Sequence, residues 1–87
     1  MKAKQMCVIY DSKADRYNPP FSVHTYGEAE RGFKDLVNDK TTAIGQHPED
    51  FILFSLGEWD DDKGILLPLV EKQSLGNGID FLVKTEK

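Results

Sequence analysis

Residues 51–70 read FILFSLGEWDDDKGILLPLV, and this stretch decides the fold. Its first half is rich in aromatic and branched side chains, which predicts a β-strand from Phe51 to Trp59. The polar run Asp60-Asp61-Asp62-Lys63-Gly64 then predicts a turn, so that Ile65 to Val70 form the return strand of a hairpin. Pro68 cannot donate to a ladder, which indicates that one side of this strand has no partner in the subunit.

The N-terminal part of the chain predicts two more strands. The apolar run Met6-Cys7-Val8-Ile9-Tyr10 ends at Asp11-Ser12, which favours a strand from about residue 3 to residue 11. A polar turn leads to a second strand from Arg16 to Val23. Because Pro19 and Pro20 lack backbone N–H groups, this strand is at an edge of the sheet or broken in the middle.

A helix is expected after the second strand. Thr25 and Glu28 have the spacing of a capping box, and Asn38-Asp39 offer a stop signal. One apolar stripe is formed by Ala29, Phe33, Leu36 and Val37. Since Gly32 in mid-helix costs on the order of 1 kcal/mol relative to Ala, packing must hold the helix. A polar connection from Lys40 to Asp50 follows it.

The order β-β-α-β-β predicts a single α+β domain over residues 1–87. We expect an antiparallel sheet of four or five strands with one amphipathic helix on one face. Near the C-terminus, Ser74 to Gly78 predict a turn, and Ile79 to Val83 are compatible with either a strand or a helix. The other face of the sheet is solvated, a dimer interface, or a platform for bases.

Composition and charge limit the classes of protein. The 87 residues carry a net charge of −4, with seven Lys/Arg against six Asp/Glu in residues 1–40 and four against nine in residues 41–87. A polyanion is therefore expected to bind at the N-terminal half. Cys7 is the only cysteine, which excludes an intrachain disulfide and fits core filling in a reducing compartment. The first residues lack the long apolar run of a secretory signal.

No pattern in the sequence indicates catalysis. There is no phosphate-binding glycine loop, no nucleophile with a base nearby in sequence, and no pair of histidines at metal spacing. His24 and His47 are expected to lie at the surface or cap an element, and Trp59 to lie in the core or at its edge. Because the Asp60-Asp61-Asp62 run lacks the alternating ligands of a calcium loop, we expect no metal there. The absence of catalytic motifs leads us to expect no enzyme and no cofactor.

One cluster mixes cations with aromatic side chains. Lys13, Arg16 and Tyr17 lie close in sequence, and Lys2 and Lys4 stand at the other end of the first strand. Cations that follow phosphates and rings that stack on bases are typical of single-strand binding. The candidate DNA contacts are Lys4, Lys13, Arg16, Tyr17 and Phe21. The alternative is that the cations only flank acidic residues in a loop while the rings pack the sheet.

The charges on the expected helix argue against reading of duplex DNA. Glu28, Glu30 and Asp35 stand against Arg31 and Lys34. A helix that enters the major groove should be basic, whereas this one is balanced. Contact with single strands is therefore favoured over contact with duplexes.

Three blocks of sequence together resemble a known family. They are Ile9-Tyr10-Asp11-Ser12-Lys13-Ala14 with Arg16-Tyr17 and Pro20-Phe21; His47-Pro48-Glu49-Asp50-Phe51 with Leu53-Phe54 and Leu56-Gly57-Glu58-Trp59-Asp60; and Ser74-Leu75-Gly76. The chain resembles the small nonstructural protein of gokushoviruses, single-stranded DNA phages of the Microviridae. The resemblance implies a DNA-binding role in viral single-strand DNA synthesis or genome packaging, in the cytoplasm of the host bacterium. It carries over no catalytic motif and no DNA-contact motif.

Two functions follow as hypotheses. The first is non-specific binding of single-stranded DNA by a homodimer, because a domain this small with a proline-marked edge often completes its core across a two-fold axis. The alternative is a protein-interaction module that docks to a phage replication or capsid protein with little direct DNA contact. The acidic C-terminal half and the strand with Pro68 support this alternative.

Overall fold

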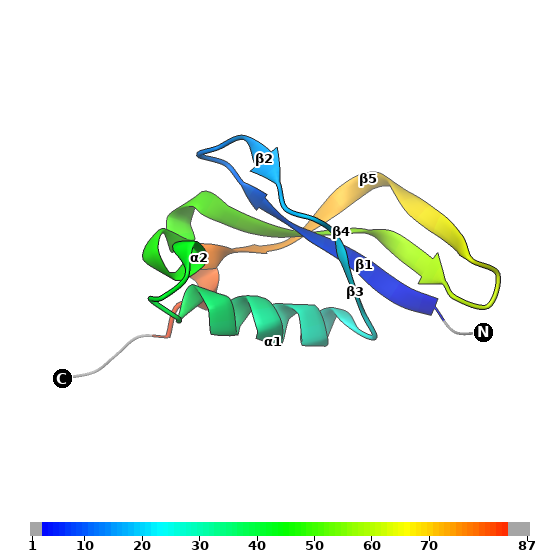
Figure 1. Ribbon diagram of the computed structural model, residues 1–87, viewed down its shortest axis with the longest axis horizontal. Coiled ribbons are helices and arrows are strands. Elements are labelled where there is room, and N and C mark those ends of the chain that lie inside the picture. The colour runs from blue at the N-terminus through cyan, green and yellow to red at the C-terminus, as the bar shows by residue number, and fades with distance from the viewer. Residues whose placement is uncertain (1–2, 84–87) are drawn as a thin grey trace.

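The computed structural model describes residues 3–83 and confirms the predicted α+β class. Its five strands form one antiparallel sheet in the order β2-β1-β4-β5, and β3 also pairs with β1 (Figure 1). In chain order the elements are β1 (Ala3–Asp11), β2 (Arg16–Tyr17), β3 (Phe21–Val23), α1 (Tyr26–Val37), α2 (Ala43–Gln46), the 3-10 turn η1 (Pro48–Asp50), β4 (Phe51–Asp60), β5 (Ile65–Asn77) and the 3-10 turn η2 (Gly78–Phe81).

The centre of the sheet is formed by β1 and β4. They pair along their full length, from Ala3 opposite Asp60 to Asp11 opposite Phe51. The predicted second strand is broken in the middle, since β2 and β3 are separate pieces on the same side of β1 with Pro19 and Pro20 between them.

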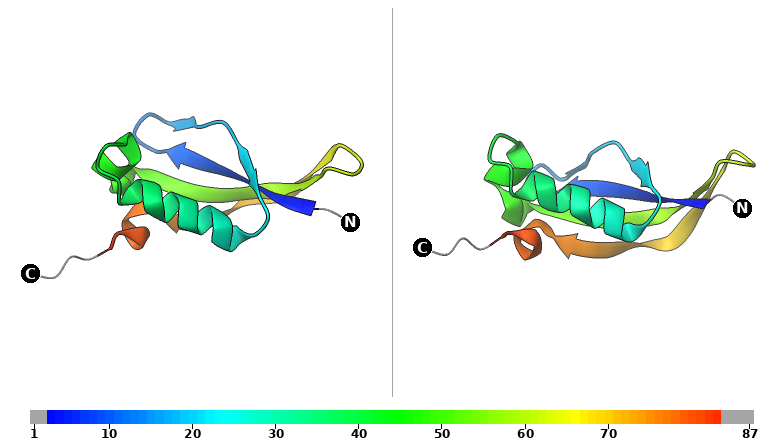
Figure 2. Two further views of the ribbon diagram at one scale, coloured as in Figure 1. Left: turned by 60° about the horizontal axis from the view of Figure 1, so that its bottom comes forward. Right: turned by 90° about the horizontal axis from the view of Figure 1, so that it is seen from below.

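Helix α1 covers one face of the sheet (Figures 1 and 2). It begins at the predicted cap, where the Glu28 backbone N–H donates to Thr25 Oγ1 at 3.2 Å. The Glu28 carboxylate reaches back as expected, but it accepts the backbone N–H of His24, at 2.8 Å. The buried core between helix and sheet consists of Cys7, Ile9, Ala29, Phe33, Val37, Ile44, Phe51 and Leu53. The expectation that Cys7 fills the core is therefore confirmed.

The C-terminal part differs from the prediction. The prediction of a turn at residues 74–78 was wrong, because β5 continues to Asn77 and Gly76 lies opposite Leu53. Leu75 packs against the core, which keeps this segment in the sheet despite its turn-like glycines. Residues 79–83 contain the end of η2 and no strand.

The connection between α1 and β4 also has structure that the sequence did not predict. Thr42 caps α2 by accepting the Gly45 backbone N–H at 2.9 Å, and Ile44 is buried in the core. None of the helices in the described part of the chain is long and apolar enough to span a membrane.

Strand β5 contains a large bulge of several residues. Ser55 is opposite Gln73, whereas Gly57 is opposite Pro68, so the segment 69–72 of β5 stands opposite Leu56 alone. The extra residues arch away from the sheet on the side opposite to α1 (Figure 1). This bulge determines the geometry of the site described next.

Candidate nucleic-acid interface

Three aromatic rings lie together on the sheet face that α1 leaves open. Tyr10 is opposite Tyr17 in the β1–β2 register, and their ring centroids are 4.5 Å apart. The ring of Phe54 lies 6.4 Å from each of the other two. Tyr10 and Phe54 are half-buried and Tyr17 is 46% exposed. We name Tyr10, Tyr17 and Phe54 the aromatic cluster.

A lysine from the opposite edge of the sheet completes this surface. The ammonium nitrogen of Lys72 lies 5.4 Å from the Tyr17 ring centroid and 5.2 Å from that of Phe54. Strands β2 and β5 are the two edges of the sheet, and both rise on the side away from α1 (Figure 1). The bulge of β5 therefore brings a cation over rings that belong to β2 and β4, within the range of a cation–π interaction.

A buried valine lies next to the aromatic cluster on the same face of the sheet. Val8 is opposite Phe54 and is only 2% exposed, although it lies outside the helix-side core. Side chains alternate between the two faces along a strand, so Val8 and Tyr10 share the open face while Ile9 points to the helix. A buried apolar side chain therefore lies beside the rings on this face.

A hydrogen bond at the rim holds one of the rings. The Tyr10 hydroxyl donates to Asp15 Oδ1 at 2.6 Å, and Asp15 has a positive φ of 54°. This hydrogen bond is the main reason why the pKa of Tyr10 is raised above its ordinary value. The same turn is closed by Asp11, whose Oδ1 accepts the backbone N–H groups of Lys13 and Ala14.

The structure separates Arg16 and Lys13 from the aromatic cluster. Tyr17 belongs to it, but Arg16 is opposite Asp11, and alternation along β2 turns it to the other face. Lys13 lines a shallow cleft together with acidic side chains of the segment 47–50 and Asp11. Its surroundings are therefore more negative than the sequence suggested.

Lys4 and Phe21 are further from Tyr17. The ammonium of Lys4 lies 3.7 Å from Asp61 Oδ2. Lys4 is six positions before Tyr10 along β1, a distance of roughly 20 Å. Phe21 is opposite Cys7 and packs against the helix-side core. Of the five expected contacts, only Tyr17 lies in the aromatic cluster. Lys2 lies outside the described residues.

Sequence reasoning missed Tyr10, Phe54 and Lys72 as site residues. In the fold, Ile52, Phe54 and Leu56 alternate with buried neighbours along β4, but the nearly continuous apolar run of this strand hides the alternation in the sequence. No signal exists for Lys72 either, since the sequence predicts the end of the strand at Val70, which lies inside the bulge.

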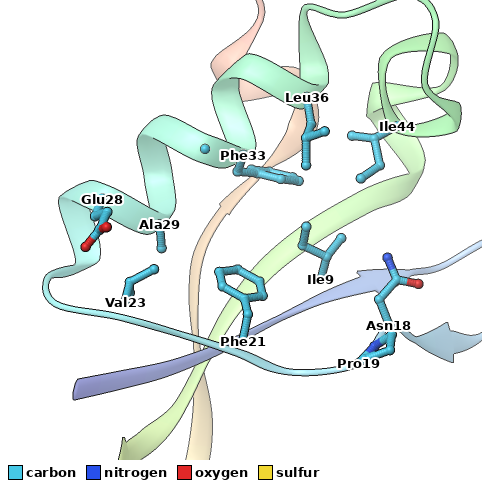
Figure 3. Close-up of a pocket in the computed structure, with 11 residues that line it drawn as sticks. Ile9, Asn18, Pro19, Phe21, Val23, Glu28, Ala29, Phe33, Leu36 and Ile44 are labelled. Carbon is cyan, nitrogen blue, oxygen red and sulfur yellow. The ribbon is translucent and has the colours of Figure 1, made fainter. Parts of the chain in front are cut away.

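An apolar cleft of about 540 Å³ lies between α1 and the segment around β3. Figure 3 shows Phe21 pointing toward Phe33 across it. Its polar lining side chains are Asn18 and Glu28, and the Glu28 carboxylate already accepts the His24 N–H. The cleft offers apolar surface and no arrangement of acid and base for catalysis.

Two groups of side chains that can bind a metal lie close enough together, among the described residues, to share a cation. In each of the sets Asp60-Asp61-Asp62 and His47-Glu49-Asp50, the ligand atoms lie within 4.8 Å of one another. Asp60 Oδ1 accepts the backbone N–H groups of Asp62 and Lys63, and the Gly64 N–H donates to the Asp60 carbonyl. The first set is thus explained as the closure of the β4–β5 turn.

Comparison with known proteins places the chain in a family. The family model described as Phage ORF5 protein matches residues 4–81, which include all of β1 except Ala3, the other strands, both helices and the aromatic cluster. No curated protein and no solved structure matches the chain. Because the family match covers most of the chain, the protein belongs to the Phage ORF5 protein family.

Proposed function

We propose that this phage protein binds single-stranded DNA without sequence specificity, through the aromatic cluster and Lys72. The observation that carries the proposal is the position of the Lys72 ammonium over the rings of Tyr17 and Phe54. In a gokushovirus of the Microviridae, such a protein would assist viral single-strand DNA synthesis or genome packaging in the host cytoplasm.

The chemistry of this surface fits a single strand. The exposed ring of Tyr17 offers a face on which a base can stack, and any base has a matching π-face. Lys72 is solvent-exposed, and among the described residues it lies over aromatic rings and forms no ion pair. Its ammonium can therefore turn to a phosphate without breaking an ion pair. Rings and cation together need no base-edge hydrogen bonds, which supports binding without sequence preference.

The remaining expected contacts extend this proposal. Lys13 and Arg16 belong to the loop and short strand that carry Tyr17, and they can meet a strand that leaves the aromatic cluster at that edge. Lys4 and Phe21 stand elsewhere on the sheet and are predicted to contribute less. The net charge of −4 keeps diffuse attraction to phosphates small, so local contacts must supply the affinity.

A titration of a labelled oligonucleotide tests the proposal. Replacing Tyr17 with Leu should weaken binding by roughly 5-fold to 150-fold, because a stacked base contributes about 1–3 kcal/mol. Fluorescence anisotropy measures the change. The matched control is Tyr26→Leu, which removes a tyrosine on the helix side of the sheet, where its hydroxyl accepts from Ser55 Oγ.

Both variants must be measured at a temperature where circular dichroism shows them folded. If Tyr17→Leu and Tyr26→Leu weaken binding equally, the aromatic cluster is not the contact surface. If the wild-type protein does not bind the oligonucleotide at low salt, single-strand binding itself is rejected.

A second function, docking to a phage replication or capsid protein, is favoured by the exposed apolar side chains of β5. Affinity capture from infected cells separates the two functions. A viral protein that remains bound in stoichiometric amount after nuclease treatment supports docking. Loss of every partner together with the DNA supports single-strand binding.

A further inference from the structure

One segment of β5 carries apolar side chains that the described chain leaves uncovered. We name Ile65–Val70 the arm. Five of its side chains expose between 39% and 103% of their surface: Ile65, Leu66, Leu67, Leu69 and Val70. Exposed apolar groups at this density on one strand mark a site of protein contact.

The arm is apolar on both of its faces. Side chains alternate along a strand, so Ile65 and Leu67 point to one face and Leu66 to the other. The hairpin tip extends past the end of α1 in a molecule whose longest dimension is 50 Å (Figure 2). The helix therefore covers neither face of the arm, whereas a strand of this composition is normally covered on both.

We propose that the arm is the docking surface for a second copy of this chain, with the two arms packed antiparallel about a two-fold axis near Leu67 and Pro68. Such a contact is isologous, because each arm supplies the same residues to the other. The inference stands apart from DNA binding, since it uses the apolar arm and not the aromatic cluster.

The area of the arm suits a small symmetric interface. Covering its side chains removes on the order of 500 Å² from each copy, within the range of the largest apolar patches on monomers and approaching the ~800 Å² per partner of a standard interface. The flanking turn and the facing residues of β4 add to this area. A dimer of modest affinity is expected.

The charges around the arm favour the antiparallel arrangement. The arm itself has no ionisable side chain. The turn before it carries three carboxylates, Asp60 to Asp62, against the single cation of Lys63, and Glu71 and Lys72 follow the arm. An antiparallel pair sets the acidic turn of each copy beside the neutral Glu71–Lys72 end of the other. A parallel pair would set two acidic turns side by side, which costs free energy.

Pro68 determines how the arms meet. Because Pro68 has no N–H, a continuous hydrogen-bonded ladder along the free edge of β5 is interrupted at its middle. The contact is therefore made by side chains on the faces of the strands. An apolar contact of this kind is insensitive to salt, unlike binding to phosphates.

Sedimentation of the full chain without nucleic acid tests the dimer. The mass should rise from 9.9 kDa toward twice that value over micromolar concentrations. Val70→Asp should raise the dissociation constant at least about tenfold, because a carboxylate is costly to bury in an apolar contact. Val70 is fully exposed, so this change removes no packing within one copy.

Leu66→Asp is a second variant on the other face of the arm and should act in the same direction. The control is Ile79→Asp, an equally apolar side chain that is 50% exposed on η2 and should leave the dimer unchanged. Three results would overturn the proposal. They are a wild-type monomer at about hundred-micromolar concentration, a dimer that neither arm variant weakens, and a monomer whose arm binds a phage replication or capsid protein instead.

Discussion

At the scale of single residues, the Tyr10–Asp15 hydrogen bond links the aromatic cluster to the β1–β2 turn. The bond needs the neutral phenol as its donor, which is why the pKa of Tyr10 lies above its ordinary value. A raised folded-state pKa stabilises the fold below the ordinary tyrosine pKa, and this contribution is lost as pH rises through the folded-state pKa.

Replacing Asp15 with Asn should lower the pKa of Tyr10 toward that of a free tyrosine, because the change removes both the carboxylate acceptor and its negative charge. Ultraviolet absorbance of tyrosinate during an alkaline titration measures this. Tyr10→Phe in the same protein identifies which transition belongs to Tyr10. An unchanged titration in Asp15→Asn would contradict the assigned hydrogen bond.

At the scale of elements, sequence patterns predicted most of the fold. Helix α1 followed from apolar periodicity and from the cap at Thr25, and the strands β1 and β4 followed from their apolar runs. The pairing of β1 with β4 was not predicted. The bulge of β5 could not be predicted, because a bulge depends on pairing with β4 and leaves no periodic pattern. Lys72 enters the site only through that bulge, so the aromatic cluster was predicted in part and its cation was not.

The close approach of β5 to β4 depends on one glycine. Gly57 has a φ of 149°, and a Cβ there would lie 2.3 Å from the carbonyl oxygen of Leu67. Gly57→Ala should therefore reduce the free energy of unfolding by roughly 1–3 kcal/mol. Gly32→Ala is the matched control, since no atom beyond its chain neighbours and the backbone of its own helix lies within 4 Å of the Cβ position. This change should stabilise α1 by about 1 kcal/mol.

Urea unfolding of both variants measures these changes. Opposite signs are expected, a loss for Gly57→Ala and a gain for Gly32→Ala. If Gly57→Ala were as stable as the wild-type protein, the strands would not approach as closely as described at the base of the arm.

At the scale of the whole molecule, the two sheet faces differ in what covers them. One face is closed by α1 and contains the core, while the other carries the aromatic cluster and Lys72. The overall charge of −4 did not indicate this division, because only the folded chain shows which cations stand beside rings. Spacing in the sequence grouped Tyr17 with Phe21, but in the fold Tyr17 lies in the aromatic cluster whereas Phe21 packs against the helix-side core.

The most direct test of single-strand binding is the salt dependence of the affinity for an oligonucleotide. The slope of log K against log salt should be about −0.7 for each phosphate neutralised. Lys72→Gln should make it shallower by about 0.7, whereas Lys34→Gln on α1 should leave it unchanged. Equal slopes for Lys72→Gln and the wild-type protein, or a wild-type slope near zero, would contradict the role of Lys72 and of the sheet face that carries it.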